Sequence, residues 1–465
     1  MTTTHQSNFR FKKVVFLIAI LACLNGCIST TIITNIPKTE IVDSDYYGMS
    51  AFSERFEDNE NSITLAFSGG GMRAAALSYG VLKALESSQL PALTDTSESQ
   101  VTLLDEVDTI SAVSGGSFTA AYYGLFGKKI FKDYEGAFLR RNIETELFRI
   151  LTNPLNWFSR KGRTDRAIDI YDRDILGGAV FRDFIKPNSP FIIINASDLA
   201  YGSRFAFIQE YFDLLCSDIS SFSVAKAVAA SAAVPVLFSP VTLENYDGCI
   251  NEAEPYLREA AEKSRSNPEL ELTSRSLMTF TDKSSKKYVH LVDGGITDNL
   301  GLRTIVDLVE ISGGARPLIR SLKLRPTERS IIISVDASTK PTTHIGESSR
   351  APSISTVISA ASSAQLHHYN VTSVALARAK QKEWAKAVSK PSHSVSTYFI
   401  QLDLTGVKNL KVRHRLNQIS TSMYLDNSEI DSLINAGRSL LLNNPEFQRL
   451  MRDLREEFTG KNREQ

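Results

Sequence analysis

The chain has 465 residues, of which 42% are hydrophobic, 22% charged and 9% aromatic. These values are typical of a folded globular protein and exclude a largely disordered chain. The length favours one large domain with additions, or two domains, over a single small core. Lys plus Arg and Asp plus Glu each number 52, so the formal charges cancel, and this balance does not indicate a nucleic-acid partner.

The N-terminal stretch NFRFKKVVFLIAILACLNGC, residues 8–27, has the layout of an export signal. Its basic residues precede an apolar run that is too short to cross a hydrocarbon core of about 30 Å as a helix. The end of the stretch, Gly26-Cys27, resembles the lipobox of bacterial lipoproteins, although Asn25 departs from the usual pattern. We therefore expect residues 1–26 to be a lipoprotein signal peptide and Cys27 to carry a lipid. The alternatives are an ordinary signal peptide and an uncleaved anchor.

On this interpretation the mature protein is exported and lipid-anchored at a bacterial membrane, where it faces the periplasm or the cell surface. Residues 27–60, which are rich in polar side chains, then form a tether. Cys216 and Cys249 are the cysteines that remain after processing, and disulfides persist in export compartments. We expect these two to form a disulfide, and a pair of buried thiols is the alternative.

From residue 61 onward the chain alternates strands and helices. Three stretches follow the order strand, glycine turn, helix: SITLAFSGGGMRAAALSYGVLKALES, LLDEVDTISAVSGGSFTAAYYGLFG and KYVHLVDGGITDNLGLRTIVDLVEIS. The continuous apolar runs at 189–199 and 329–338 are typical of buried parallel strands. The sequence therefore predicts an α/β fold with a mainly parallel sheet.

The main domain is expected over residues 61–340, with a polar, helix-prone insertion at 251–286. Residues 341–465 are expected to complete the fold and to end in a helical cap. Residues 139–175 combine basic and aromatic side chains. That combination suits either a lid at a membrane interface or a helix packed on the core.

The glycine loop SGGGMRA, residues 68–74, follows a strand and opens a helix, so several backbone N–H groups converge there with the positive end of the helix dipole. A P-loop would need Gly-Lys-Ser or Gly-Lys-Thr at this point, which the sequence lacks. The spacing of Gly69, Gly71 and Ala74 fits a dinucleotide-binding loop, but a clear partner carboxylate about 20 residues further on is missing. The third interpretation is an oxyanion hole, whose amides stabilise a tetrahedral intermediate.

The segment Ala112-Val113-Ser114-Gly115-Gly116 lies between a predicted strand and a predicted helix. A nucleophile elbow needs a serine at such a turn, with small residues two positions before and after it, because the turn is tight. Ala112 stands where glycine is usual, Gly116 fits, and Gly115 adds an amide near the developing negative charge. Ser114 is therefore the candidate nucleophile.

The segment Asp293-Gly294-Gly295 ends the apolar run YVHLVD. Asp-Gly-Gly is common turn chemistry, which is the simpler interpretation. The functional interpretation, in which Asp293 belongs to the site, depends on the direction of the strand. If this strand is parallel to the others, its carboxyl end brings Asp293 to the same edge of the sheet as the two glycine turns.

Taken together, the three motifs resemble those of the patatin-like phospholipase family. The resemblance covers most of residues 62–340 and includes the blocks FIIINASDLAYGSRFAF and AVAASAAVPVLFSPV. It implies a three-layer α/β/α sandwich, a patatin-like catalytic domain over 61–340, and a Ser114–Asp293 dyad without histidine. It also implies an oxyanion hole from Gly69, Gly70, Gly71 and Met72, with motif-supporting positions at Arg73, Ala112, Gly115, Gly116, Gly294 and Gly295.

The implied function is a serine acyl hydrolase of lipid esters, of the phospholipase A or lysophospholipase type, without cofactor or metal. Its expected partners are a lipid or other ester and the membrane that holds the anchor. One rival is a Ser–His–Asp triad, whose candidate histidines are His290, His344, His367, His368, His393 and His414. Another is a catalytically silent or nucleotide-binding, membrane-tethered protein that uses the glycine loop.

Overall fold

The computed structural model describes residues 33, 35–38, 47–53, 60–90, 101–152, 161–235, 237–249, 253–263, 267–324, 327–339, 345–346, 349–391 and 393–464. The predicted signal peptide, Cys27 and His344 lie outside the described residues, as does most of the predicted tether. Within the described ranges, no helix is both long enough and apolar enough to cross a membrane.

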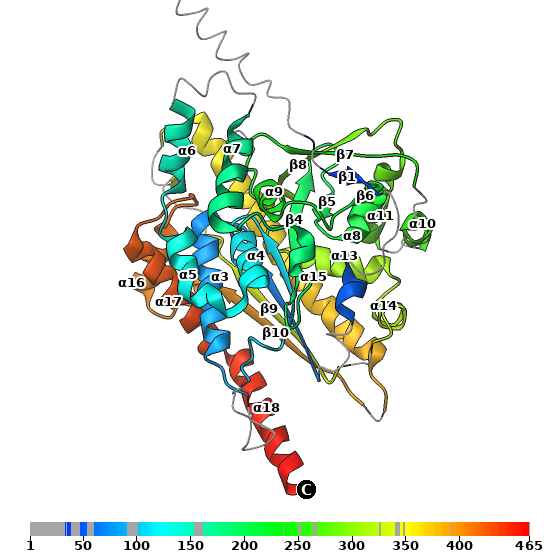
Figure 1. Cartoon of the computed structure of the whole chain (residues 1–465). Coiled ribbons are helices and arrows are strands. Elements are labelled where there is room, and N and C mark those ends of the chain that lie inside the picture. The colour runs from blue at the N-terminus through cyan, green and yellow to red at the C-terminus, as the bar shows by residue number, and fades with distance from the viewer. Residues whose placement is uncertain are drawn as a thin grey trace, which may run out of the picture.

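An eight-stranded sheet forms the centre of the molecule (Figure 1). Its strand order is β10-β9-β2-β3-β4-β8-β7, and β5 pairs with β4 off this path. The five strands from β10 to β4 are parallel, and the apolar runs predicted as buried parallel strands form β4 and β9. The strand bounds are β2 (Asn61–Phe67), β3 (Val107–Val113), β4 (Phe191–Asp198), β5 (Arg204–Ala206), β7 (Val241–Glu244), β8 (Tyr288–Asp293), β9 (Arg329–Asp336) and β10 (Ser396–Asp403). A separate pair joins β1 (Ile36–Pro37) to β6 (Ser217–Asp218).

The strand that ends at Asp293 does not run in the predicted direction. β8 pairs antiparallel with β4, and Asp293 lies opposite Ala196. In the parallel pair of β3 with β4, Val113 lies opposite Asn195, which is the neighbour of Ala196 in β4. The expectation of a parallel strand at Asp293 is therefore wrong. The aspartate still reaches the carboxyl edge of the parallel strands, because β8 approaches that edge from outside and ends there.

Helices cover both faces of the sheet, which makes the fold a three-layer α/β/α sandwich (Figure 1). On one face α3 (Gly71–Glu86) and α4 (Gly115–Phe126) pack against the strands, and α17 (Asn427–Leu442) packs on α3. On the other face lie α13 (Leu302–Ile311), α14 (Ala315–Ser321) and the long α15 (Ile354–Val388). The remaining helices are α5 (Ile130–Tyr134), α6 (Ile143–Thr152), α7 (Arg163–Ile170), α8 (Gln209–Leu214), α9 (Val224–Ser231), α10 (Ala253–Lys263), α11 (Pro268–Met278), α12 (Gly295–Asp298), α16 (Leu410–Gln418) and α18 (Pro445–Glu464).

Helix α3 is buried on nearly every side, because α17 covers the face that the sheet leaves open. Two glycines make this contact close. A Cβ atom on Gly80 would collide with the carbonyl oxygen of Ile434, and one on Gly437 with the carbonyl oxygen of Leu77. The C-terminal part of the chain is therefore more than an outer cap, since α17 completes the hydrophobic core around α3.

The segments 251–286 and 139–175 pack against the main domain, and 139–175 places Leu139, Ile143 and Tyr171 in its core, as the core-packing alternative expects. Helices α10 and α11 occupy the predicted insertion at 251–286 and pack on each other and on α13. The segment 139–175 contains α6 and α7, while its aromatic residues Trp157 and Phe158 lie outside the described residues. Cys216 and Cys249 form a disulfide in the structure.

We expect Gly80→Ala to lower the thermal unfolding midpoint, because the added methyl group meets the backbone of α17. Overpacking of this kind costs about 1–3 kcal/mol. The matched control is Gly136→Ala, where an added Cβ has nothing within 4 Å, and its effect should stay within about 0.5 kcal/mol. Calorimetry that gives Gly80→Ala the midpoint of the unmodified chain would contradict the close helix contact.

Candidate active site

Ser114 stands at the turn between β3 and α4 with a φ of 50° and a ψ of −121°. A positive φ is uncommon for a residue with a Cβ atom, and such strain clusters at functional sites. The residue is largely buried, and the α4 helix begins directly after it. The predicted order of strand, tight turn and helix is therefore present, with the serine at the strained position.

The glycines on either side of this turn permit a backbone-to-backbone contact. A Cβ atom on Gly115 would collide with the carbonyl oxygen of Gly71, and one on Gly116 would lie 2.7 Å from the carbonyl oxygen of Ser68. A Cβ atom on Gly69 would lie 3.3 Å from the Cβ atom of Ser114. The glycine loop after β2 and the serine turn after β3 are thus in close backbone contact.

Ser231, at the end of α9, holds the serine turn from the opposite side. Its Oγ accepts a hydrogen bond from the Ser114 N–H at 2.8 Å and donates one to the Asn195 carbonyl oxygen at 2.6 Å. Because that proton is directed at Asn195, the Ser117 hydroxyl at 2.9 Å donates to Ser231. No sequence motif pointed to Ser231; the usable signal was a single serine inside the apolar block AVAASAAVPV, and the structure shows that it is fully buried.

The Asp293 carboxyl group lies next to Ser114. Its Oδ1 accepts the Gly295 N–H at 2.7 Å, and the nearby Ser114 side chain favours the charged form of the same carboxyl group and so lowers its pKa. A Cβ atom on Gly294 would collide with the carbonyl oxygen of Asn195, so only glycine lets the chain turn against β4 here. Each glycine of the Asp-Gly-Gly motif thus has its own role, one in packing and one in binding the carboxylate.

Burial raises the pKa of Asp293 to about 6, and the hydrogen bond from Gly295 and the Ser114 side chain lower it by less. Removal from water disfavours the charged form of a carboxyl group, whereas hydrogen bonds to the carboxylate favour it. A carboxylate whose pKa is close to neutral is a stronger proton acceptor than an ordinary aspartate. The environment of Asp293 therefore suits a general base.

The glycine loop differs in detail from the four-residue oxyanion hole implied by the sequence. The N–H of Gly69 donates to the Asn299 carbonyl oxygen at 2.9 Å, and the N–H of Met72 donates to the Ser422 carbonyl oxygen at 2.8 Å. Both hydrogens are therefore used in structural bonds. Among the described residues, no acceptor is bonded to the N–H of Gly70 or Gly71, and these two glycines have φ values of 139° and 58°. Their N–H groups, unlike those of Gly69 and Met72, are therefore not used in structural bonds within the described part of the chain.

Arg73, the next side chain along, is structural in this conformation. Its Nε donates to the Ala337 carbonyl oxygen and its Nη1 to the Ile419 carbonyl oxygen, both at 2.7 Å. Burial lowers the pKa of Arg73 to about 10, although the nearby Asp336 raises it. Arg73 thus ties the start of α3 to the end of β9 and to the segment before α17.

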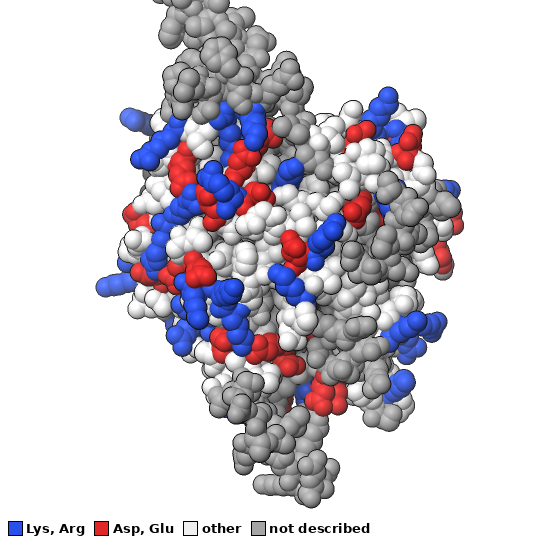
Figure 2. Space-filling model, in the orientation of Figure 1, with Lys and Arg blue, Asp and Glu red and all other residues white. Residues whose placement is uncertain are grey.

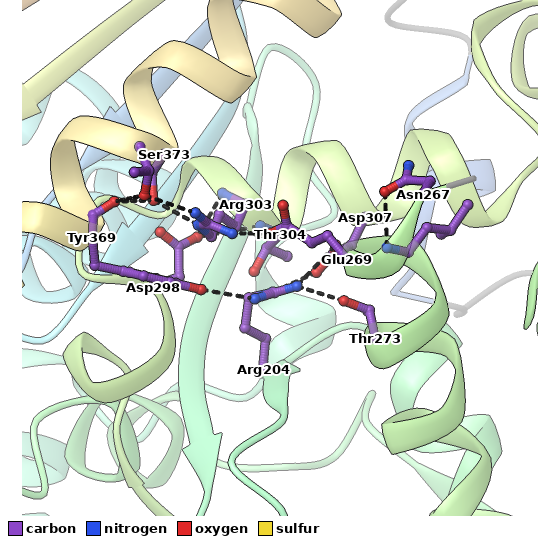
Figure 3. Close-up of polar contacts among 12 residues, drawn as sticks. Arg204, Asn267, Glu269, Thr273, Asp298, Arg303, Thr304, Asp307, Tyr369 and Ser373 are labelled. Carbon is purple, nitrogen blue, oxygen red and sulfur yellow. Dashed lines mark hydrogen bonds and ion pairs between the residues drawn. The ribbon is translucent and has the colours of Figure 1, made fainter. Parts of the chain in front are cut away.

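A buried group of charged side chains supports the helices that follow β8 (Figure 3). The Asp298 carboxylate accepts the Arg303 N–H at 2.7 Å and so caps the start of α13. Arg204 forms a two-pronged ion pair with Asp307, with N–O distances of 2.5 and 3.1 Å. Tyr369 of α15 accepts a hydrogen bond from Arg204 at 3.1 Å and packs on the Arg303 guanidinium. These contacts hold α12 and α13 in place behind the Asp293 turn.

The described histidines bond to groups other than the serine and the aspartate. His367 and His368 lie on α15, on the far face of the sheet. The nearest partners of the others are Thr242 Oγ1 at 3.0 Å for His290, the Thr327 carbonyl oxygen at 3.2 Å for His393, and Gln418 Nε2 at 3.0 Å for His414. Among the described histidines, none completes a Ser–His–Asp arrangement.

The described residues hold no group of three or more His, Cys, Asp or Glu side chains arranged to bind a metal ion. A cavity of about 250 Å³ lies between the sheet and α13–α15, where its lining includes Ser62, Ile193 and Trp384. Asn61 and Ser62, which also line the cavity, are the first two residues of β2, and the glycine loop follows the last one, so this cavity is at the opposite edge of the sheet from Ser114.

A model of the family "Patatin-like phospholipase" matches residues 65–306, slightly more than half of the chain. The chain belongs to the patatin-like phospholipase family. No curated protein matched this patatin-like chain in a sequence search.

The patatin-like chain is also similar to two solved structures of human GIVD cytosolic phospholipase A2. The first, in complex with methyl gamma-linolenyl fluorophosphonate, is 12% identical with a TM-score of 0.38, over 88% of this chain and 62% of that chain. The second is 11% identical with a TM-score of 0.39, over 92% of this chain and 66% of that chain. The patatin-like chain thus spans less than two thirds of either.

We expect Asp293→Asn to stabilise the protein above about pH 6. The pKa of Asp293 in the folded protein, about 6, exceeds the ordinary value of 3.8. Between these values the folded state holds a proton that the unfolded state has lost, so stability falls as the pH rises. Above pH 6 the full cost, on the order of 3 kcal/mol, is present, and asparagine removes it while keeping an acceptor for Gly295.

The measurement is the thermal midpoint of Asp293→Asn and of the unmodified protein at about pH 8 and about pH 4. The variant should unfold at the higher temperature near pH 8, and the difference should shrink near pH 4. A variant that is less stable near pH 8 would contradict the buried, raised-pKa carboxyl group.

Proposed function

We propose that the protein is a serine acyl hydrolase of lipid esters, of the phospholipase A or lysophospholipase type. Ser114 is the nucleophile, Asp293 the general base, and the N–H groups of Gly70 and Gly71 form the oxyanion hole. The observation that carries the proposal is the pairing of a strained serine with a buried aspartate of raised pKa. Family membership supports the class of substrate.

In the first half of the proposed reaction, Ser114 Oγ attacks the carbonyl carbon of the ester, and its proton passes to Asp293. The carbonyl oxygen becomes an oxyanion, which the amides of Gly70 and Gly71 stabilise together with the positive end of α3. The intermediate then collapses, and the bond to the leaving oxygen breaks. Asp293 returns the proton to that oxygen, which leaves as an alcohol or lysolipid.

In the second half, water hydrolyses the acyl-enzyme. Asp293 takes a proton from the water as its oxygen adds to the acyl carbonyl carbon, and the same amides hold the oxyanion. The bond to Ser114 Oγ breaks, Asp293 returns the proton to the serine, and the fatty acid is released. Since the carboxylate form of Asp293 accepts the proton in both halves, the rate should fall as the pH drops below about 6.

The competing interpretations have less support. In the nucleotide-binding alternative, a phosphate could use only the Gly70 and Gly71 amides of the described loop, since the N–H groups of Gly69 and Met72 are bonded to the Asn299 and Ser422 carbonyl oxygens. The positive φ of Ser114 and the burial of Asp293 both lower stability, and in a catalytically silent protein no function would offset that cost. We therefore favour the hydrolase.

We expect Ser114→Ala and Asp293→Asn each to lower ester hydrolysis by about 10³-fold or more, because one removes the nucleophile and the other the base. The rates are measured on p-nitrophenyl butyrate and on phosphatidylcholine vesicles. His290→Gln is the matched control: it lies on the same strand as Asp293 and should hydrolyse both substrates at nearly the normal rate.

Two outcomes would count against this mechanism. Near-normal hydrolysis by Asp293→Asn would exclude the dyad. Folded protein that does not react at Ser114 with a fluorophosphonate probe would favour the catalytically silent alternative.

We also propose that the protein is an exported bacterial lipoprotein that is anchored through Cys27, with residues 1–26 removed and the stretch before β1 as a tether. The N-terminal sequence pattern supports this. The predicted tether over 27–60 is too long, because β1 pairs with β6 and Tyr47 is fully buried in the core. Cys27→Ser should abolish incorporation of labelled palmitate and lower the fraction of protein in the membrane pellet. Cys23→Ser is the matched control, because this cysteine would leave with the signal peptide. Labelling of Cys27→Ser at the normal level would exclude the anchor.

A further inference from the structure

Three exposed apolar side chains lie beside the proposed catalytic pair. Val234, Leu237 and Ile296 have exposed fractions of 40%, 58% and 54%. The Asp293 N–H donates to the Ala233 carbonyl oxygen at 3.0 Å, which places Val234 at the end of β8. The Leu237 N–H donates to the Val234 carbonyl oxygen at 3.2 Å, and Ile296 lies in the first turn of α12. We call these three residues the apolar rim.

The chain around the apolar rim carries no exposed charge close to it in sequence. Residues 229–243, AASAAVPVLFSPVTL, contain no charged side chain, and neither does the segment 294–297. Asp298, the next charged residue after Ile296, is buried. Grouped, exposed apolar side chains mark interaction surfaces, and the lack of charge here favours an apolar partner.

Charged side chains flank the rim on one side. Ser239, two residues beyond Leu237, donates its N–H to Thr164 Oγ1 at 2.8 Å, and the Thr164 hydroxyl donates to the Ser239 carbonyl oxygen at 2.9 Å. These bonds bring the start of α7 to the rim, where Arg163 is exposed and Lys161 forms an exposed ion pair with Asp169 at 2.7 Å. Figure 2 shows Lys and Arg atoms, mixed with Asp and Glu atoms, over the part of the surface where Figure 1 places α6 and α7. Because this flank carries charges of both signs (Figure 2), the uncharged apolar side chains of the rim are what fit a lipid surface.

We propose that the apolar rim is a membrane-contacting surface, which enters the boundary between headgroups and acyl chains of a phospholipid bilayer and so brings Ser114 to the ester. The proposal rests on the proposed function, because it supplies the route by which an aggregated lipid reaches the serine. Side chains that are about half exposed fit contact with an external apolar phase. The wall of a pocket that encloses one acyl chain would be more buried.

The first test locates the face that touches the bilayer. An environment-sensitive fluorophore is attached to Leu237→Cys or Ile296→Cys in the full chain, and vesicles of phosphatidylcholine and phosphatidylglycerol carry a spin-labelled lipid as quencher. We expect quenching at both rim positions. Leu272→Cys on α11 is the matched control, because Leu272 is 69% exposed but lies outside the rim, and its label should be quenched little.

An N-terminal lipid anchor would attach all of these variants to the vesicles equally. The chain without the added cysteine, treated with the same fluorophore, gives the signal from labelling at the native cysteines. Equal quenching at Leu237→Cys and Leu272→Cys, or none at the rim, would overturn the proposal. Quenching of the fluorophore does not require ester hydrolysis, so the same measurement is repeated in proteins that also carry Ser114→Ala. Loss of hydrolysis and loss of membrane contact are thereby seen separately.

The second test uses Leu237→Asp, with Leu272→Asp as its control. Leu237→Asp should lower hydrolysis of vesicle phospholipid by about tenfold or more, because a charge opposes entry into the bilayer, and should leave p-nitrophenyl butyrate hydrolysis unchanged. An equal loss on both substrates would assign the rim to an acyl-chain subsite and overturn the proposal. If the unmodified protein hydrolyses neither ester but its rim labels are quenched, the proposed function fails and the membrane contact stands.

Discussion

The proposed site depends on one backbone contact, in which Gly115 lies against the carbonyl oxygen of Gly71. Because β2 and β3 are parallel neighbours, the turns that follow them emerge at the same edge of the sheet. A side chain at Gly115 would push these turns apart. Its absence lets the N-termini of α3 and α4 converge, which brings the positive ends of two helix dipoles close to the Ser114 turn.

Contacts elsewhere in the domain stabilise the close approach of the two turns. Helix α17 packs on α3, Arg73 ties the start of α3 to two other segments, and the ion pairs around Arg204 fix the helices after β8. That support matters because the site itself opposes folding: Ser114 is strained and Asp293 is buried with a raised pKa. Proteins tolerate such local costs at functional sites when well-packed surroundings offset them.

Much of the architecture could be predicted from local sequence. The apolar runs of β4 and β9 and the glycine turns after β2 and β3 are where their residues predict them, because burial and tight turns place demands on neighbouring residues. The direction of β8 could not be predicted in this way, since its apolar pattern suits either direction and only pairing with β4 decides it. The structural bonds of Gly69 and Met72, which the sequence resemblance places in the oxyanion hole, could not be predicted for the same reason: their N–H groups bond to Asn299 and Ser422, which are distant in the chain.

The sequence by itself determined the strained turn at Ser114, the glycine loop before it and an Asp-Gly-Gly turn after it, because each is a local demand for small residues at a fixed spacing. Only the tertiary structure decided that Asp293 reaches Ser114 from an antiparallel strand and that Ser231 holds the serine turn through its N–H. Those contacts join segments more than a hundred residues apart. Their geometry follows from strand pairing and helix packing across the whole domain, which no short pattern encodes.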